Sequence, residues 1–383
     1  MKKPKHRSAF RVRLWVGTRK GLWTLTSDRA RKKWKLAGPE FLGQTIYHAF
    51  PDPRRPKMLV AAAKTGHLGP TVFRSVDGGK NWKEAKMPPK FTPHSETGPR
   101  ALEHVFWLTA GHASEPGVWY AGTAPHGIFR SEDNGDTWAA VTGFNDSPMW
   151  PRWSHHGAGA SPPDSPNTHS IRIDPRDPKH LYAAFSAGGV HESLDRGKSW
   201  RPLNQGVATV FPAEKDPEFY GNDPHCFVIH PVNPDRLYQQ NHCGIYRLDR
   251  PGTTWKRIGN NMPKSIGDIG FPIVVHPRDP DTAWVFPMDG TEVWPRTSPG
   301  GKPAVYGTRD AGETWKRLDS GFPRAQSFLT VKRQSMSADN ADPVGVYLGT
   351  TSGDIWASRD EGARWQRIAQ SLPSITSVGA FRA

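Results

Sequence analysis

The chain has 383 residues, among them 38 glycines and 37 prolines, and this abundance of turn-forming residues indicates many short strands rather than helices. No apolar run is long enough to span a bilayer and no signal-peptide-like stretch follows the basic N-terminus, so a membrane protein is excluded and a cytoplasmic location is expected. The net charge of +15 suits an anionic partner, but lysine and arginine are scattered along the chain, so nucleic acid is not the expected partner. Cys226 and Cys243 are too few for a disulfide framework.

The first strands of the chain form an incomplete group. A basic tail is expected over residues 1–10, followed by strands at 13–17, 21–25 and 34–36, and an innermost strand is missing. Residues 375–381 have a strand pattern at the place where other repeats begin a new inner strand. We therefore expect this C-terminal strand to join the N-terminal group, close the ring and remove exposed sheet edges.

A short motif, Ser/Thr-x-Asp-x-Gly-x-x-Trp, recurs along the chain. The five good copies are Ser75–Trp82, Ser131–Trp138, Ser193–Trp200, Thr308–Trp315 and Ser358–Trp365. Two weaker copies end at Trp34 and Trp255. The seven tryptophans are 48 to 62 residues apart, which is the spacing of a repeat architecture rather than of independent domains.

Each motif lies between two strand-like runs and is typical of a hairpin turn. Its aspartate can accept backbone N–H bonds, its glycine supplies a positive φ, and its tryptophan is an apolar anchor. We interpret these aspartates as turn residues and not as catalytic or calcium-binding groups. Seven such units predict an all-β, seven-bladed β-propeller with four-stranded antiparallel blades, formed by residues 11–383 as a single domain.

Three middle repeats share an inner-strand phrase that begins near His169, His225 and Phe271. His169 and His225 each stand six residues before a proline. Because the starts of inner strands point toward the central channel of a propeller, these two histidines are expected to approach each other. His242 is expected in the adjoining turn of the blade that carries His225.

Imidazoles that converge with a carboxylate suit Zn²⁺, Mn²⁺ or Fe²⁺. The candidate residues, as metal ligands or as acid–base groups without a metal, are Glu103, His169, His225 and His242. The candidate substrate-binding residues are Arg100, Asp223, Gln240 and Asn241. Arg100 could hold a substrate carboxylate in bidentate fashion. The alternative is that the histidines only join neighbouring blades by hydrogen bonds.

The recurring motif is that of the Asp-box, or BNR repeat, and the chain resembles that β-propeller family over essentially its whole length. The arrangement is most similar to bacterial single-propeller proteins labelled sialidase-like or glycosyl hydrolase-like. The phrases that carry the similarity lie at residues 16–22, 120–123, 239–244 and 358–362. The Phe/Tyr-Arg-Ile-Pro motif that sialidases of this family have near their start is absent, and no residue of their catalytic set can be transferred to this chain.

Three functions are compatible with these patterns. The first is an intracellular enzyme, a hydrolase or lyase with a metal-dependent or metal-free His-rich site, that acts on a small anionic or sugar-like substrate in the central pocket. The second is a non-catalytic binding or assembly propeller that docks a protein or a polyanion. The third is a sialidase-like glycoside hydrolase, which would need a pair of carboxylates. The acids that could supply such a pair are Glu96, Glu103, Asp223, Asp268, Asp289 and Glu292.

Overall fold

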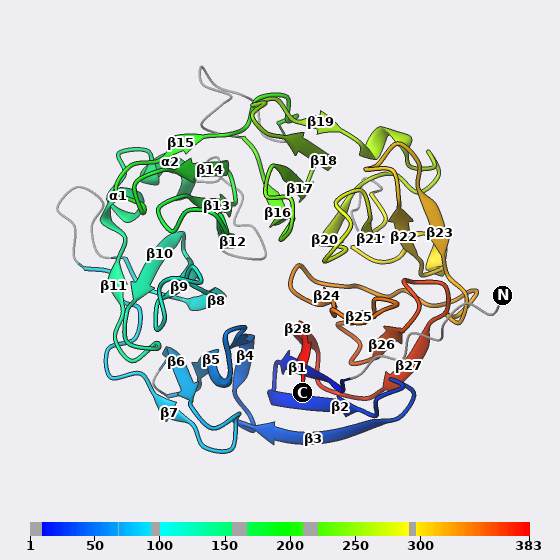
Figure 1. The fold of residues 1–383 in the computed structure, drawn as a ribbon, viewed down its shortest axis with the longest axis horizontal. Helices are drawn as coiled ribbons and strands as arrows, with labels where there is room; N and C mark the ends of the chain where they lie inside the picture. The colour runs from blue at the N-terminus through cyan, green and yellow to red at the C-terminus, as the bar shows by residue number, and fades with distance from the viewer. Residues whose placement is uncertain (1–9, 68, 93–99, 155–166, 210–220, 291–295) are drawn as a thin grey trace. The chain divides into compact units, whose positions relative to one another are not determined.

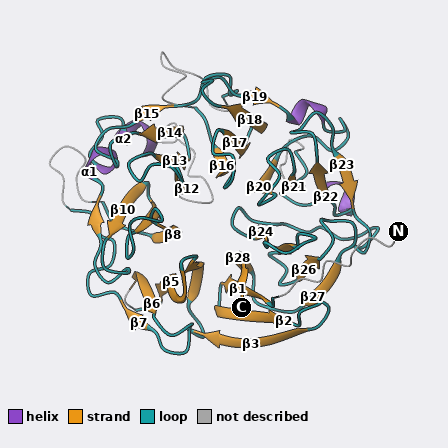
Figure 2. Ribbon diagram, viewed as in Figure 1, coloured by secondary structure: helices purple, strands orange, loops and turns teal. Residues whose placement is uncertain are grey.

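The protein is built from seven four-stranded antiparallel β-sheets with very little helix (Figures 1 and 2). The computed structural model describes residues 10–67, 69–92, 100–154, 167–209, 221–290 and 296–383. Its fold class is the expected all-β, seven-bladed propeller with four-stranded blades. The chain divides into two compact units, Met1–Ile46 with Asn261–Ala383, and Tyr47–Asn260. The basic tail over residues 1–10 and the single-domain boundaries stay predictions, because residues 1–9 are outside the described ranges.

The unit formed by the two ends of the chain contains three of the sheets. The first is β28 (Ile375–Arg382), β1 (Val12–Thr18), β2 (Gly21–Ser27) and β3 (Trp34–Glu40). The second is β20 (Gly270–Val275), β21 (Ala283–Pro287), β22 (Val305–Thr308) and β23 (Lys316–Leu318). The third is β24 (Met336–Ala338), β25 (Val346–Gly349), β26 (Ile355–Ser358) and β27 (Gln366–Ala369). The 3-10 turn η2 (Pro299–Gly301) belongs to this unit, and η1 (Gly259–Asn261) contains the point in the sequence where the central unit ends.

The C-terminal strand completes the N-terminal sheet, as the sequence predicts. β28 pairs antiparallel with β1 from Val12↔Arg382 to Gly17↔Ser377, and Figure 1 shows the red strand beside the blue one. Val378 of β28 is buried in the apolar cluster that also holds Leu14. The first group of strands therefore obtains its innermost strand from the other end of the chain.

The central unit contains the other four sheets and the two short helices. The first sheet is β4 (Thr45–Asp52), β5 (Arg55–Thr65), β6 (Gly69–Ser75) and β7 (Lys83–Glu84). The second is β8 (His104–Ala110), β9 (Trp119–Ala124), β10 (Gly127–Ser131) and β11 (Ala139–Ala140), followed by α1 (Thr142–Asn145) and α2 (Trp150–Ser154). The third is β12 (Thr168–Ile173), β13 (Leu181–Phe185), β14 (Gly189–Ser193) and β15 (Arg201–Pro202). The fourth is β16 (Pro224–Ile229), β17 (Arg236–Asn241), β18 (Gly244–Asp249) and β19 (Lys256–Arg257).

The apolar core lies between the faces of successive sheets. Val60 of β5 and Val105 of β8 share one cluster with Trp119, and Tyr182 of β13 shares another with Phe227 of β16. Large side chains such as these bury most of the apolar surface that stabilises the fold. Side chains of β9 and β13, the second strands of two sheets in the central unit, pack into apolar clusters on both faces of their sheet, so these strands are buried along their whole length.

The five good motifs fold as one and the same turn. In each, the Ser or Thr hydroxyl accepts the backbone N–H of the glycine at 2.8 to 2.9 Å and donates to the aspartate at 2.7 to 2.8 Å. The glycines have φ between 80° and 91°, a conformation that side chains with a Cβ rarely adopt. The aspartates therefore serve the turn, in agreement with the sequence interpretation.

The described part of the chain contains no helix with the length and apolar character needed to cross a membrane. Cys226 is buried and Cys243 is half-buried, and they do not form a disulfide with each other.

Candidate active site

Three neighbouring inner strands of the central unit each contain a β-bulge close to their start. Pairing with the next strand passes from Val105 to Trp107 in β8, from Thr168 to Ser170 in β12, and from Pro224 to Cys226 in β16. The skipped residues are Phe106, His169 and His225. A bulge turns the side chain of its extra residue away from the regular alternation of the strand. The three residues are thus structurally equivalent, which confirms the correspondence between His169 and His225 that their distance from a proline predicts.

The bulge side chains follow one another from blade to blade. The ring centroids of Phe106 and His169 are 5.6 Å apart, and those of His169 and His225 are 6.4 Å apart. Both imidazoles are almost fully buried, with exposures of 0% and 1%. The predicted approach of His169 and His225 is therefore realised in the structure.

The turns that follow β13 and β17 bring one further side chain to each histidine. Ser186 follows β13, and its Oγ lies 2.7 Å from Nε2 of His169. His242 follows β17, and its ring centroid lies 5.4 Å from that of His225. Ser186 and His242 are equivalent in the repeat, so an alignment of the two blades on Phe185 and Asn241 would have revealed Ser186 from the sequence.

Asp223 is held between these two turns by backbone hydrogen bonds. Gly221 N–H donates to the carbonyl of Ala187 at 2.8 Å, and Asn222 forms an isolated parallel bridge with Gly188. On the other side, His242 N–H donates to the carbonyl of Asp223 at 2.9 Å. The segment just before β16 is therefore fixed to both blades, and this places the Asp223 carboxylate among the imidazoles.

The Asp223 carboxylate faces three histidines. Its Oδ2 lies 3.4 Å from Nε2 of His225 and 3.4 Å from Nδ1 of His242, and its Oδ1 lies 3.5 Å from Nε2 of His169. Burial raises the pKa of Asp223, but the contacts with the three imidazoles lower it further, so the net pKa lies well below the usual value. Asp223 is therefore a charged carboxylate at neutral pH.

This arrangement resembles a ligand or acid–base set more than a nucleophilic triad. Ligand atoms from Asp223, His225 and His242 all lie within 4.8 Å of one another. Ser186 and Asp223 both lie next to His169 in space, as the serine and carboxylate of a triad would. However, the hydroxyl and the carboxylate contact the same ring nitrogen of His169, Nε2. A serine triad needs the carboxylate on the nitrogen that faces away from the serine. The geometry therefore disfavours serine as a nucleophile.

Glu103 does not join this cluster. Its side chain is about half exposed, and the contact the structure gives its carboxylate is 3.9 Å to Nδ1 of His104. The physical reason is its position: Glu103 stands three residues before the bulge of β8, where Phe106 occupies the place of the two histidines. The carboxylate in the cluster is that of Asp223, which the sequence suggests as a substrate-binding residue and as one acid of a possible carboxylate pair, but not as a partner of the histidines.

Arg100 is engaged with its own protein. Its guanidinium donates to the carbonyl of Asn145 at 2.6 Å and to Asp146 at 3.2 Å, and it lies over the rings of Phe91 and Trp150 at 4.7 and 4.5 Å. Only 3% of its side chain is exposed. The Arg100 guanidinium, which the sequence suggests for binding a substrate carboxylate, is thus bound to Asn145 and Asp146 of the α1 region. In this structure Arg100 has a structural role.

Gln240 and Asn241 shape the turn that carries His242. The Gln240 amide donates to the carbonyls of Asn241 and Gly244 at 3.2 and 3.3 Å. The Asn241 side chain donates to Gln239 and accepts the N–H of Cys243, both at 3.2 Å. Both residues are buried, so they position the turn rather than line an open surface.

Four further acids that the sequence suggests for a carboxylate pair are Glu96, Asp268, Asp289 and Glu292. Glu96 and Glu292 lie outside the described residues. Asp268 and Asp289 belong to the unit formed by the chain ends, whereas Asp223 belongs to the central unit. Among the described residues, Asp223 is the acid grouped with the imidazoles.

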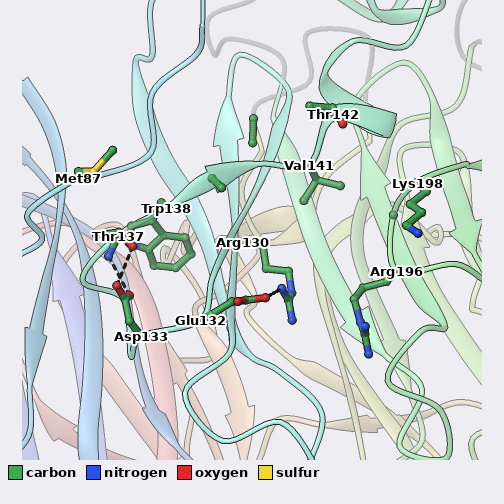
Figure 3. Close-up of a pocket in the computed structure, with 13 residues that line it drawn as sticks. Met87, Arg130, Glu132, Asp133, Thr137, Trp138, Val141, Thr142, Arg196 and Lys198 are labelled. Carbon is green, nitrogen blue, oxygen red and sulfur yellow. Dashed lines mark hydrogen bonds and ion pairs between the residues drawn. The ribbon is translucent and has the colours of Figure 1, made fainter.

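A groove of about 750 Å³ lies elsewhere in the central unit and is shown in Figure 3. It is lined by the motif turns that follow β10 and β14, at the ends of these strands that are remote from the cluster. Its arginines are paired, Arg130 with Glu132 and Arg196 with Glu115. Because it is built from repeated turn residues with internal ion pairs, we do not assign the active site to this groove.

Comparison with known proteins gives relatives among polysaccharide-degrading enzymes. No family model matches the chain. A probable oligoxyloglucan-reducing end-specific xyloglucanase of Neosartorya fischeri is 26% identical over 315 residues, which cover 78% of this chain and 33% of that protein. The oligoxyloglucan-reducing end-specific xyloglucanase of Emericella nidulans is 25% identical over 224 residues, 51% of this chain and 25% of that protein. The chain has xyloglucanase homologues. It spans a quarter to a third of their length.

Solved structures share the fold. The GH74 xyloglucanase from Xanthomonas campestris matches with a TM-score of 0.61 and 17% identity, over 95% of this chain and 53% of that one. YCF48 bound to D1 peptide matches with a TM-score of 0.50 and 14% identity, over 92% of both chains. At these identities the likeness concerns the propeller fold alone.

Proposed function

We propose that this protein is an enzyme that acts on a sugar-like or anionic carbohydrate substrate, as a hydrolase or a lyase, with its reaction centre at Asp223, His169, His225 and His242. The observation that carries the proposal is the convergence of one charged carboxylate and three imidazoles from two blades. This centre is either a metal site or a set of acid–base groups. The substrate class is supported by the xyloglucanase homologues.

The cluster has the character of a functional site because it departs from the repeat. Five of the motif turns fold alike, whereas the equivalent bulge position holds Phe106 in one blade and histidine in the next two. Buried polar and charged groups cost stability compared with apolar side chains of similar size. Catalytic sites are places where such groups and strongly shifted pKa values gather.

The two reaction classes use the same residues differently. In a hydrolase, a neutral imidazole removes a proton from the attacking water and a protonated group assists the leaving oxygen. In a lyase, the imidazole removes the proton from the carbon next to the carboxylate of a uronic acid residue. The bond from the neighbouring carbon to the glycosidic oxygen then breaks, a C=C double bond forms between the two carbons, and the leaving oxygen takes up a proton. Asp223 stabilises the positive charge that forms on a histidine in either case, because it contacts all three rings.

The test is an activity screen with matched variants. Xyloglucan oligosaccharides and uronic acid-containing oligosaccharides are incubated with the protein, and new reducing ends and new conjugated double bonds are measured. Asp223→Asn and His169→Gln should each lower the rate by about 10²-fold or more, the usual effect of removing an acid–base group. His180, which contacts Asp174 and Glu192 at the other end of β13, is the control, and His180→Ala should keep the parent rate. Turnover that survives in both site variants would contradict the proposal.

The net charge of +15 favours a second candidate, a propeller that docks a protein or a polyanion without chemistry. Docking depends on surface charge and not on the buried imidazoles. A complex that weakens with salt and binds equally well after His169→Ala and His225→Ala would support docking. Loss of binding in these variants would speak against it.

A further inference from the structure

The spacing inside the cluster differs from that of ordinary charged hydrogen bonds. Hydrogen bonds between an imidazolium and a carboxylate are about 2.7–2.9 Å long, yet Asp223 Oδ2 is 3.4 Å from both His225 Nε2 and His242 Nδ1. Two ligand atoms that are each about 2.1 Å from the same ion, at a tetrahedral angle, lie about 3.4 Å apart. The two distances from Asp223 thus match the separation of ligands around a common ion, and all three ligand atoms lie within 4.8 Å of one another.

From this geometry we infer that Asp223, His225 and His242 hold one divalent transition-metal ion. The inference deepens the proposed function, and it rests on the same reaction centre. Three protein ligands leave coordination positions for water or for a substrate oxygen, as in catalytic rather than structural metal sites. An ion there would polarise a sugar hydroxyl or carboxylate oxygen.

The backbone fixes the three ligands before any ion binds. His225 is the bulge residue of β16, and its imidazole is buried with 1% exposure. Asp223 and His242 are joined by a backbone hydrogen bond of 2.9 Å, which keeps their side chains on the same side of the β17–β18 turn. Rigid ligands that are already close together lower the conformational cost of binding an ion.

The ligand chemistry selects a class of ions. Two imidazoles and one carboxylate suit Zn²⁺, Fe²⁺ or Mn²⁺, whereas Ca²⁺ and Mg²⁺ prefer sets made only of oxygen. Magnesium and calcium should therefore bind far more weakly than zinc or cobalt.

His169 belongs to the site but lies outside the ligand set. Its Nε2 faces the hydroxyl of Ser186 at 2.7 Å and the other carboxylate oxygen of Asp223 at 3.5 Å. It is also not grouped with the three ligand residues. In this assignment His169 is the acid–base group, and Ser186 orients its ring.

The experiment measures metal binding apart from activity. The protein is purified without a polyhistidine tag and stripped with a chelator. It is then titrated with Zn²⁺ by calorimetry and with Co²⁺ by visible absorption, in which bound cobalt shows its ligand-field bands. One ion per chain is expected for the parent and for His180→Ala. His242→Gln and Asp223→Asn should bind at least 100-fold more weakly, while circular dichroism and the melting temperature confirm that both are folded.

His169→Gln separates the ligands from the acid–base group. This variant should bind Zn²⁺ and Co²⁺ with nearly the parent affinity and give the same cobalt spectrum, but lose turnover. Failure of the folded parent to bind either ion would overturn the metal assignment, and turnover that persists in chelator would leave the proposed function standing without it. A normal metal titration with no turnover on any carbohydrate would instead count against the proposed function and leave the metal site in place.

Discussion

Two kinds of buried histidine occur in the central unit, and their surroundings decide their charge. His169 and His225 face the carboxylate of Asp223. His191 of β14 is also buried, but it packs between the rings of Trp153 and Phe185 at centroid distances of 5.2 and 5.0 Å. Neither of its ring nitrogens has a hydrogen-bond partner among the described residues. Burial therefore lowers the pKa of His191 to about 3, and this imidazole is neutral at physiological pH.

His191 should make the protein less stable in mild acid. A histidine in the unfolded chain has a pKa of about 6.5. Below that pH, His191 is protonated in the unfolded state but stays neutral in the folded state. The free energy of unfolding then falls as the pH falls, by up to about 1.4 kcal/mol per pH unit until the pH approaches the folded pKa. His191→Phe removes this penalty. Relative to the parent, the variant should gain about 2 kcal/mol more at pH 5 than at pH 7.5, measured by urea denaturation.

The exposed His67 provides the control for this measurement. His67→Ala should change the free energy of unfolding little, because this side chain is exposed. If the difference between His191→Phe and the parent is equal at pH 5 and pH 7.5, then His191 is not held neutral by burial.

One buried hydroxyl forms two of the hydrogen bonds that stabilise each motif turn. The Ser131 Oγ accepts the N–H of Gly135 at 2.9 Å and donates to Asp133 at 2.8 Å, and Ser131 is buried. Ser131→Ala leaves the buried N–H of Gly135 without its acceptor, which should cost about 1–3 kcal/mol in the free energy of unfolding. Guanidinium denaturation would show this as a lower midpoint with an unchanged slope.

The control for Ser131 is a hydroxyl on the outside of an equivalent turn. Ser199 is exposed and donates to Asp195 at 2.6 Å. Its replacement by alanine should cost less than half as much as Ser131→Ala, because water replaces the lost partner. Equal losses for the two variants would mean that the buried hydroxyl has no special role in the turn.

Features that are determined by a short stretch of sequence could be predicted. Features that depend on hydrogen bonds between distant segments could not. The motif gives seven blades because its turn chemistry is contained within eight consecutive residues. The approach of His169 and His225 follows from a repeated spacing. The position of Asp223 depends on backbone hydrogen bonds to two separate turns, to Ala187 and to His242, and no local pattern records these. For this reason the sequence suggests Glu103 as the carboxylate of the cluster, although the structure places Asp223 there.

The two ends of the strands differ in function across the molecule. Along β14, Gly189 pairs with Phe185 beside the turn that carries Ser186, while Ser193 at the other end begins a motif turn. The motif end has the same turn in five blades, so it stabilises the fold. The other end varies from blade to blade and holds the candidate site. Substitutions in the motif turns should therefore change stability with little effect on metal binding, and substitutions in the cluster should do the reverse.

The strand that completes the N-terminal sheet should be essential to the stability of its unit. β28 covers the edge of β1, and its side chains Ile375 and Val378 are 1% and 3% exposed in a shared apolar cluster. Deletion of residues 375–383 would expose both the strand edge and this cluster, and an uncovered edge promotes aggregation. We expect the truncated chain to lose its cooperative thermal transition or to precipitate.

Two point variants and a peptide make this prediction specific to β28. Val378→Ala should lower the free energy of unfolding by about 1–3 kcal/mol because it leaves a cavity in the cluster. The exposed Arg382 at the end of the strand is the control, and Arg382→Ala should leave the free energy of unfolding nearly unchanged. A synthetic peptide of residues 375–383 should restore the transition of the truncated chain when it is added in excess, since binding to the folded form alone stabilises that form. A truncated chain that melts like the parent without the peptide would show that the pairing of β28 with β1 contributes little to the stability of the unit.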